Sequence, residues 1–136
     1  MQHNNITLLD KIIAVFSYMT LGFLGMIWFL VNTLIIRKPM SNFLKYNLVQ
    51  SFIISIILAI ATYAYEIISG IVFNLGFIGD IFKMAHIYIF ATPIFNTMNF
   101  ANYILLLFLI YLSVFALFGK LPFVPYITDI AKKIFN

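Results

Sequence analysis

PMSNFLKYNLVQSFIISIILAIATYAY, residues 39–65, is the stretch that decides the fold of this chain. It begins as a short basic and aromatic segment and passes without a break into a long apolar run. Such a sequence is typical of a chain that lies at a membrane surface and then enters the bilayer as a helix. The stretch therefore indicates where the protein resides before it indicates what the protein does.

The composition of the whole chain agrees with a membrane location. Of its 136 residues, 64% are hydrophobic and 9% are charged, whereas about half of a soluble domain is apolar and about a quarter is charged. We therefore predict an all-α integral membrane protein, with the lipid bilayer as its first partner. The net charge of +4 does not indicate a nucleic-acid partner, because the basic residues flank apolar runs.

The apolar runs predict one membrane domain over residues 1–136, built as a small bundle of about four hydrophobic helices. Three are expected to be full spans, one is a short helix that contains a proline, and a short amphipathic helix follows at the C-terminus. The predicted hydrophobic helices cover residues 12–36, 46–69, 82–98 and 100–118.

The first of these runs, 12–36, allows two interpretations. It holds no charged residue over 25 positions, and as one helix it would be about 37 Å long, enough to cross a ~30 Å hydrocarbon core. Gly22 and Gly25 lie near its middle. They suit either close helix packing in a single span or the turn of a re-entrant hairpin. We expect the single span, because each half of a hairpin would be too short to cross.

The helix predicted over 46–69 carries a polar face. At 100° per residue its polar side chains fall within one arc, opposite an arc of isoleucines. Since lipid offers polar groups no partners, this face should meet protein or water. A helix–helix interface is the expected role, and the wall of a polar cavity or conduit is the alternative. The residues of this candidate face are Asn47, Gln50, Ser51, Ser55, Thr62 and Glu66.

The later part of the chain is expected to hold one further span. Residues 82–98 contain Pro93 and would form only about 25 Å of helix, which suits a short, tilted or interfacial segment. Residues 100–118 are predicted to cross the membrane. In the C-terminal segment Thr128 can cap an amphipathic helix, with Asp129 at its start and lysines at its end.

Basic residues predict the orientation. Six of the eight occur in segments 37–45 and 120–136, so both segments should be cytoplasmic, or stromal in a plastid. An even number of crossings then separates them, which 46–69 and 100–118 supply if 82–98 does not cross. The N-terminus lies outside if 12–36 crosses once, and inside if 12–36 is a hairpin. The six basic residues are Arg37, Lys38, Lys45, Lys120, Lys132 and Lys133.

No recognisable catalytic chemistry is present. The chain holds no phosphate-binding loop, nucleophile elbow or zinc-protease motif, and it has no cysteine. We therefore expect no enzymatic activity, no metal and no cofactor. Glu66 and His86 are the ionisable pair on which a proton-linked or small-solute transporter subunit would depend. A purely structural membrane subunit is the remaining alternative.

Two stretches together resemble the Tic20 family of small membrane proteins. The first, Met40–Ile54, shows an aromatic, a basic residue, a second aromatic and then Asn-x-x-Gln entering a helix. The second, Gly119–Ile134, shows a Gly and a basic residue after the last span, then a Pro and an Ile-Ser-Glu-like triplet before a short helix. The residues that match these patterns are Phe43, Lys45, Tyr46, Asn47 and Gln50, and Gly119, Lys120, Pro125, Ile127, Thr128 and Asp129.

The resemblance implies a fold of about four membrane helices with both termini on one side. It implies a non-enzymatic role within a membrane assembly, which for plastid members is protein translocation. The partners it implies are other membrane proteins or further copies of the chain. The membrane would be the bacterial inner (plasma) membrane or the plastid inner envelope. The family's first two spans would be compressed here into 12–36, and 70–98 has no clear counterpart.

Overall fold

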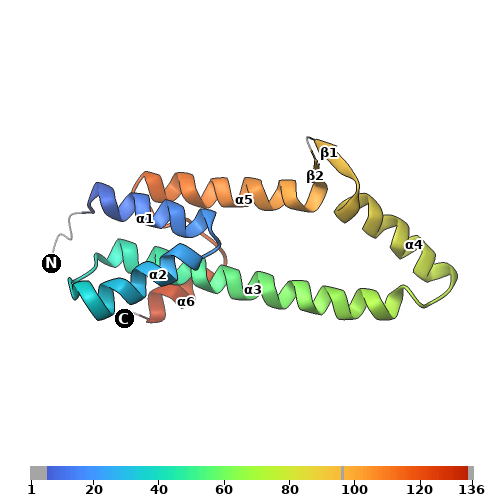
Figure 1. Ribbon diagram of the computed structural model, residues 1–136, viewed down its shortest axis with the longest axis horizontal. Coiled ribbons are helices and arrows are strands. Elements are labelled where there is room, and N and C mark those ends of the chain that lie inside the picture. The colour runs from blue at the N-terminus through green and yellow to red at the C-terminus, as the bar shows by residue number, and fades with distance from the viewer. Residues whose placement is uncertain (1–5, 96, 135–136) are drawn as a thin grey trace. The chain divides into compact units, whose positions relative to one another are not determined.

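The computed structural model describes residues 6–95 and 97–134, and most of them are helical (Figure 1). The chain divides into two compact units, which are described separately below. Unit 1 comprises Met1–Ile57 and Leu109–Asn136, and unit 2 comprises Leu58–Phe108. In chain order the elements are α1 (Leu8–Met19), α2 (Phe23–Val31), the π-helical turn η1 (Asn32–Ile36), α3 (Asn42–Val72), α4 (Phe77–His86), the π-helical turn η2 (Ile87–Ala91), β1 (Pro93–Phe95), β2 (Met98–Asn99), α5 (Phe100–Leu117) and α6 (Ile127–Ile134).

Unit 1 contains α1, α2, the first half of α3, the end of α5 and α6 (Figure 1). Small residues and a few large ones form its core, so that helices approach closely there. α1 begins at a capping box, in which the Thr7 hydroxyl accepts from the Asp10 N–H and the Asp10 carboxylate accepts from the Thr7 N–H. The buried apolar residues are Ala14, Tyr18, Leu44, Leu48, Ile54, Leu112, Ala116, Val124 and Ala131.

Residues 12–36 form a helical hairpin, so the prediction of one continuous span is wrong. α1 ends at Met19, and α2 runs back against α1 after a turn at residues 20–22 (Figure 1). Leu21 and Gly22 both adopt left-handed backbone conformations, with φ of 49° and 81°. Two such residues in succession reverse the chain, and glycine tolerates this conformation without strain.

Neither arm of the hairpin is long enough to cross a membrane. The 12 residues of α1 span about 18 Å, and the nine of α2 with the five of η1 span about 21 Å. Both lengths fall short of a ~30 Å hydrocarbon core. The hairpin alternative considered from the sequence therefore describes this segment.

Two helices of the described residues are long and apolar enough to cross a membrane, namely α3 and α5. α3 has 31 residues, which make about 46 Å of helix, and α5 has 18, which make about 27 Å. They confirm helices at 46–69 and 100–118, with α3 longer than predicted at both ends. A bundle of four hydrophobic helices in one domain stays a prediction.

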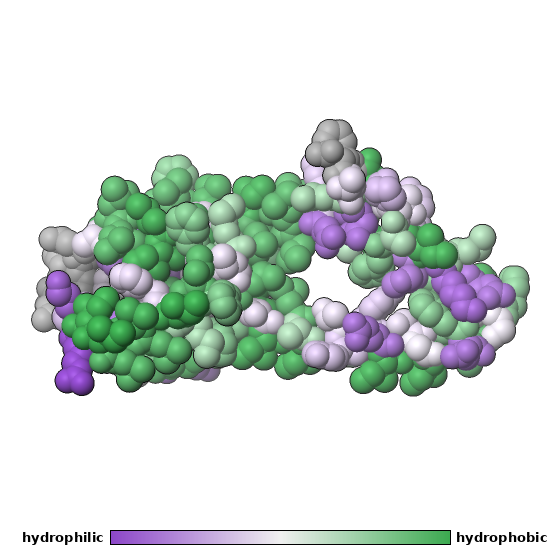
Figure 2. Space-filling model, viewed as in Figure 1, coloured by the Kyte–Doolittle hydropathy of each residue, from purple (hydrophilic) through white to green (hydrophobic). Residues whose placement is uncertain are grey.

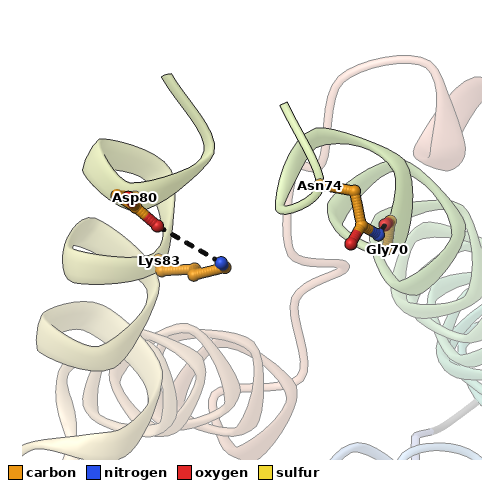
Figure 3. A network of polar contacts seen from close by, with 4 residues as sticks. All are labelled: Gly70, Asn74, Asp80 and Lys83. Carbon is orange, nitrogen blue, oxygen red and sulfur yellow. Dashed lines mark hydrogen bonds and ion pairs between the residues drawn. The ribbon is translucent and has the colours of Figure 1, made fainter. Parts of the chain in front are cut away.

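Unit 2 contains the second half of α3, α4, η2, a small hairpin of strands and the first half of α5. α3 ends where the Asn74 side-chain amide donates to the Gly70 carbonyl over 2.7 Å (Figure 3). Gly76, with φ of 58°, then leads into α4. One turn into α4, Lys83 pairs with Asp80 at 3.3 Å (Figure 3). Both side chains are exposed, so the pair contributes little to stability.

The prediction of one helix over 82–98 is wrong beyond Ala91. Thr92 is extended, as the residue before a proline prefers, and Pro93 cannot donate to a helical ladder. β1 and β2 then pair antiparallel, with Pro93 opposite Asn99. Asn99 stabilises both sides of this hairpin, because its side chain donates to the Phe90 carbonyl and accepts from the Asn102 N–H at the start of α5.

Candidate functional site

The predicted polar face of α3 is divided between the two units. In unit 1, Asn47, Gln50 and Ser51 are at most 1% exposed and lie inside the protein. Ser55 is half-buried, whereas Thr62 and Glu66 in unit 2 are exposed. The first half of the face is therefore a packing surface, and only the second half is open to lipid, water or a partner.

Buried polar pairs join α1 to α3. The Tyr18 hydroxyl donates to the Asn47 side-chain oxygen over 2.9 Å, and the Asn47 amide donates to the Phe43 carbonyl over 2.8 Å. Ser17, the residue before Tyr18 on α1, shares a hydroxyl–hydroxyl hydrogen bond with Ser51, which lies one turn beyond Asn47 on α3. These contacts are the interhelical bonds expected where polar side chains have no water.

A glycine lets α2 join the same interface. A Cβ atom on Gly25 would overlap the Ser17 hydroxyl and would lie 3.0 Å from Leu48 Cδ2. α2 therefore approaches α1 and α3 more closely than any larger residue would permit. The close packing expected of Gly25 from the sequence is present, although in a hairpin rather than a straight helix.

We expect the Tyr18–Asn47 pair to show strong coupling in a double-mutant cycle. Tyr18→Phe and Asn47→Leu should each lower the free energy of unfolding by about 1–3 kcal/mol, because each leaves a buried polar partner unsatisfied. The double variant should be about 1–2 kcal/mol more stable than the sum of the single effects predicts. The fluorescence of Trp28, the sole tryptophan, reports unfolding of unit 1 in detergent micelles.

Thr62→Val is the matched control for this cycle. Its hydroxyl is exposed and bonds only the Leu58 carbonyl of its own helix. The change should therefore stay within about 0.5 kcal/mol. Additive effects of Tyr18→Phe and Asn47→Leu would contradict the pairing.

The two stretches that resemble the Tic20 family meet in unit 1. Gln50 of the first donates to the Pro122 carbonyl of the second over 2.9 Å, across 72 positions of sequence. The Thr128 hydroxyl donates to the same carbonyl over 3.3 Å and accepts from the Val124 N–H at 2.8 Å. Thr128 was expected to cap α6, but α6 begins at Ile127, and the hydroxyl reaches back to the preceding loop instead.

The remaining matched residues surround this contact or end its helices. Gly119 has φ of 73°, and the N–H groups of Gly119 and Lys120 bond the Ala116 and Phe115 carbonyls. This is the glycine-dependent termination of α5. Phe43, Lys45, Tyr46 and Ile127 are half-buried, whereas Lys120, Pro125 and Asp129 are exposed. Residues 135–136 of the predicted basic segment 120–136 lie outside the described residues.

Sequence reasoning missed three members of the unit 1 cluster. Ser17 and Tyr18 lie on α1, and the Pro122 carbonyl is a backbone atom in a loop. Serine side chains in apolar helices usually bond carbonyls of their own helix, and a backbone carbonyl carries no residue-type signal. Only the spatial arrangement of α1, α3 and the α5–α6 loop identifies them.

In unit 2, His86 lies in an aromatic cluster rather than beside Glu66. Its Nδ1 shares a hydrogen bond with the Tyr65 hydroxyl, and its ring lies 5.2 Å from that of Phe90 and 5.4 Å from that of Phe73. These side chains line an apolar pocket of about 280 Å³ between α3 and α4. A proton relay that uses Glu66 and His86 gains no support from this arrangement, and it stays a hypothesis.

Within 6–95 and 97–134, no three His, Asp or Glu side chains are grouped so that they could hold a metal ion. No protein-family model, curated protein or solved structure matches this chain.

Proposed function

We propose that this chain is a Tic20-like membrane protein that acts without catalysis as a subunit of a membrane assembly, with protein translocation as its leading role. The observation that carries the proposal is the hydrogen bond from Gln50 to the Pro122 carbonyl. It joins the two stretches on which the resemblance depends, and Thr128 adds a second bond at the same atom. Residues that resemble one family in two distant stretches thus form one buried contact.

Burial supports the placement of α3 and α5 in a membrane. Only 11% of the most apolar window of α3 and 17% of that of α5 are buried by the chain itself. Ile60 and Ile67 are 63% and 65% exposed. Apolar surface on this scale needs lipid or a protein partner to cover it. The proposed membranes are the bacterial inner membrane and the plastid inner envelope.

The basic residues of unit 1 support a single orientation. The start of α1, the α2–α3 connection and the end of α5 lie at the same end of this unit (Figure 1). A Cβ atom on Gly119 would lie 3.5 Å from the Lys11 Nζ, so α1 begins beside the end of α5. By the positive-inside rule this end faces the cytoplasm or stroma. With a hairpin at 12–36, the N-terminus faces the same side as the segments 37–45 and 120–134.

The part of the polar face of α3 that unit 1 does not bury is the proposed contact with other subunits. Asn47, Gln50 and Ser51 are occupied by packing, which leaves Ser55, Thr62 and Glu66 for a partner or a conduit wall. A polar row on a lipid-exposed helix would be costly unless protein or water covers it. The opposite face of isoleucines suits lipid.

We expect photo-crosslinkers to distinguish these two faces in native membranes. A benzophenone amino acid at Ser55 or Thr62 should give protein adducts several-fold more often than one at the matched controls Ile60 and Ile67. The controls lie on the opposite face of the same helix. The adducts are counted on denaturing gels after membrane isolation. Equal protein crosslinking from both faces would overturn the proposed interface, and recovery of the chain in the soluble fraction would overturn the membrane placement.

A further inference from the structure

An apolar groove runs between α2 and the beginning of α3 in unit 1. Its volume is about 280 Å³, and its lining is almost wholly hydrocarbon. α2 contributes Met26, Phe29 and Leu30, and α3 contributes Leu48, Val49 and Phe52. Met26, Leu30 and Phe52 are between 42% and 49% exposed, so the groove is open along one side.

One end of the groove is closed and the other ends at a basic turn. At the closed end a Cβ atom on Gly22 would lie 3.0 Å from Phe52 Cα, so the α1–α2 turn rests on the backbone of α3. At the other end Asn32 holds the turn, because its carbonyl accepts from the Arg37 N–H over 2.7 Å and its side chain donates to the Lys38 carbonyl over 2.8 Å. Hydrophilic residues gather at this end of unit 1 (left in Figure 2).

The lining of the groove lies close to the basic turn. Along α3 it runs from Leu48 to Phe52, a rise of about 6 Å, and Leu30 on α2 precedes Arg37 by seven positions, about 10 Å of helix. Lys45 lies on the same face of α3 as Leu48, Val49 and Phe52, at positions i, i+3, i+4 and i+7. A basic residue thus lies one turn before the apolar wall.

The charge at the mouth is positive. Arg37, Lys38 and Lys45 lie within nine positions that hold no acidic residue. The nearby carboxylate of Asp10 accepts from the Ser41 hydroxyl over 2.9 Å and from the Thr7 N–H. Arg37 and Lys38 are both exposed, and together they outnumber this carboxylate. An apolar slot beside a basic turn is complementary to an anionic amphiphile.

We propose that this groove binds an anionic phospholipid, with one acyl chain against Leu30, Val49 and Phe52 and the phosphate at Arg37 and Lys38. The inference rests on the membrane placement proposed above. A second copy of the chain fits the groove less well. In one membrane it would bring its own basic turn to the same level, and like charges would face each other.

The charge at the mouth is tested by the lipid that the purified chain retains in detergent. Native mass spectrometry compares dioleoyl phosphatidylglycerol with dioleoyl phosphatidylcholine and with soluble glycerol phosphate. The wild-type chain should retain phosphatidylglycerol preferentially. Arg37→Gln with Lys38→Gln should weaken its affinity about 25-fold, since each cation near an anionic headgroup contributes about fivefold. The matched control is Lys132→Gln with Lys133→Gln in the last turn of α6, which removes the same charge elsewhere.

A second pair of variants tests the groove itself. Leu30→Trp fills the groove from an exposed position and should lower phosphatidylglycerol affinity at least tenfold. Ile67→Trp adds the same side chain to an exposed site of α3 in unit 2 and should leave the affinity unchanged. Circular dichroism verifies that both variants keep their helix content.

Several results would overturn the inference. These are equal retention of phosphatidylcholine, displacement of the lipid by glycerol phosphate alone, an equal loss in the α6 control, or a dimer that Leu30→Trp abolishes. Two further measurements distinguish failure of the lipid site from failure of the proposed function. They are carbonate extraction of the chain and thiol labelling of Lys38→Cys in vesicles. If the chain stays in the membrane with position 38 on the cytoplasmic side, only the lipid site is lost.

Discussion

Replacement of Gly22 by alanine should destabilise unit 1 by about 3 kcal/mol, combining backbone strain with overpacking. Gly22 has φ of 81°, a conformation that costs an L-residue roughly 1–2 kcal/mol. The added Cβ would also lie 3.0 Å from Phe52 Cα and from the Ser51 carbonyl oxygen. Both neighbours are backbone atoms of α3, which cannot move aside as a side chain does, and such overpacking costs about 1–3 kcal/mol.

Two other glycines separate these contributions. Gly76 has φ of 58° and ψ of −132°, a different conformation that also favours glycine, and nothing lies within 4 Å of its ideal Cβ, so Gly76→Ala adds backbone strain without overpacking. Gly70 lies inside α3 with open space around it, and Gly70→Ala should be neutral or stabilising by up to about 1 kcal/mol. Far-UV circular dichroism follows these two variants in unit 2.

Chemical unfolding in micelles measures the Gly22 effect, with Trp28 as the probe of unit 1. The expected order of stability is Gly70→Ala, then Gly76→Ala, then Gly22→Ala as the least stable. If Gly22→Ala unfolds like the wild-type chain, α1 and α2 do not turn against α3 at this residue. A continuous helix over 12–36 would then be restored as the better interpretation.

The double change Gln50→Leu with Thr128→Val should have the second large effect, about 3 kcal/mol, by stranding two buried backbone groups. The Pro122 carbonyl loses both of its side-chain donors, and the Val124 N–H loses its acceptor. Gln50→Leu alone should cost about 1 kcal/mol, because Thr128 still bonds the carbonyl. The two changes share one acceptor, so their effects should not add.

Hydrogen exchange of the α6 amides is the direct measurement. The double variant should lose protection over Ile127–Ile134, since the loop that anchors α6 to α3 is no longer bonded there. Thr128→Ser keeps the hydroxyl and is the matched control for Thr128→Val. Asp129→Asn, at an exposed position, should leave exchange unchanged. Unaltered protection of α6 in the double variant would show that Gln50 does not join the two stretches.

The same experiment bears on the proposed function. The Tic20 resemblance depends on residues 40–54 and 119–134, and their contact at Pro122 is what the double variant removes. A variant that remains in the membrane but releases α6 should lose its assembly partners in photo-crosslinking. Retention of the same partners would assign the contact to stability alone.

Much of the fold could be predicted from local sequence signals. The helices at α3 and α5 follow from long uncharged runs, because a lipid environment demands internally bonded backbone. The break near Pro93 has its cause in the missing N–H, although the sequence prediction extended the helix across it to residue 98. The short α6 follows from isoleucines three and four positions apart after Pro125, with charged residues between them. These rules act within one segment and need no knowledge of its neighbours.

The hairpin within 12–36 could not be predicted in the same way. Gly22 and Gly25 suit a helix crossing as well as a turn, and hydropathy is the same in both cases. What distinguishes them is that Gly22 meets the α3 backbone and Gly25 meets Ser17. Helix length alone therefore favoured the wrong alternative.

The sequence by itself determined that this protein has long apolar helices, basic connecting segments and a polar face on the helix that follows Pro39. Only the tertiary structure decided how that face is used. Asn47 and Ser51 bond α1, Gln50 bonds the loop before α6, and Thr62 and Glu66 remain exposed. The physical reason is that a hydrogen bond needs a partner in space, and these partners lie 29 to 72 positions away along the chain.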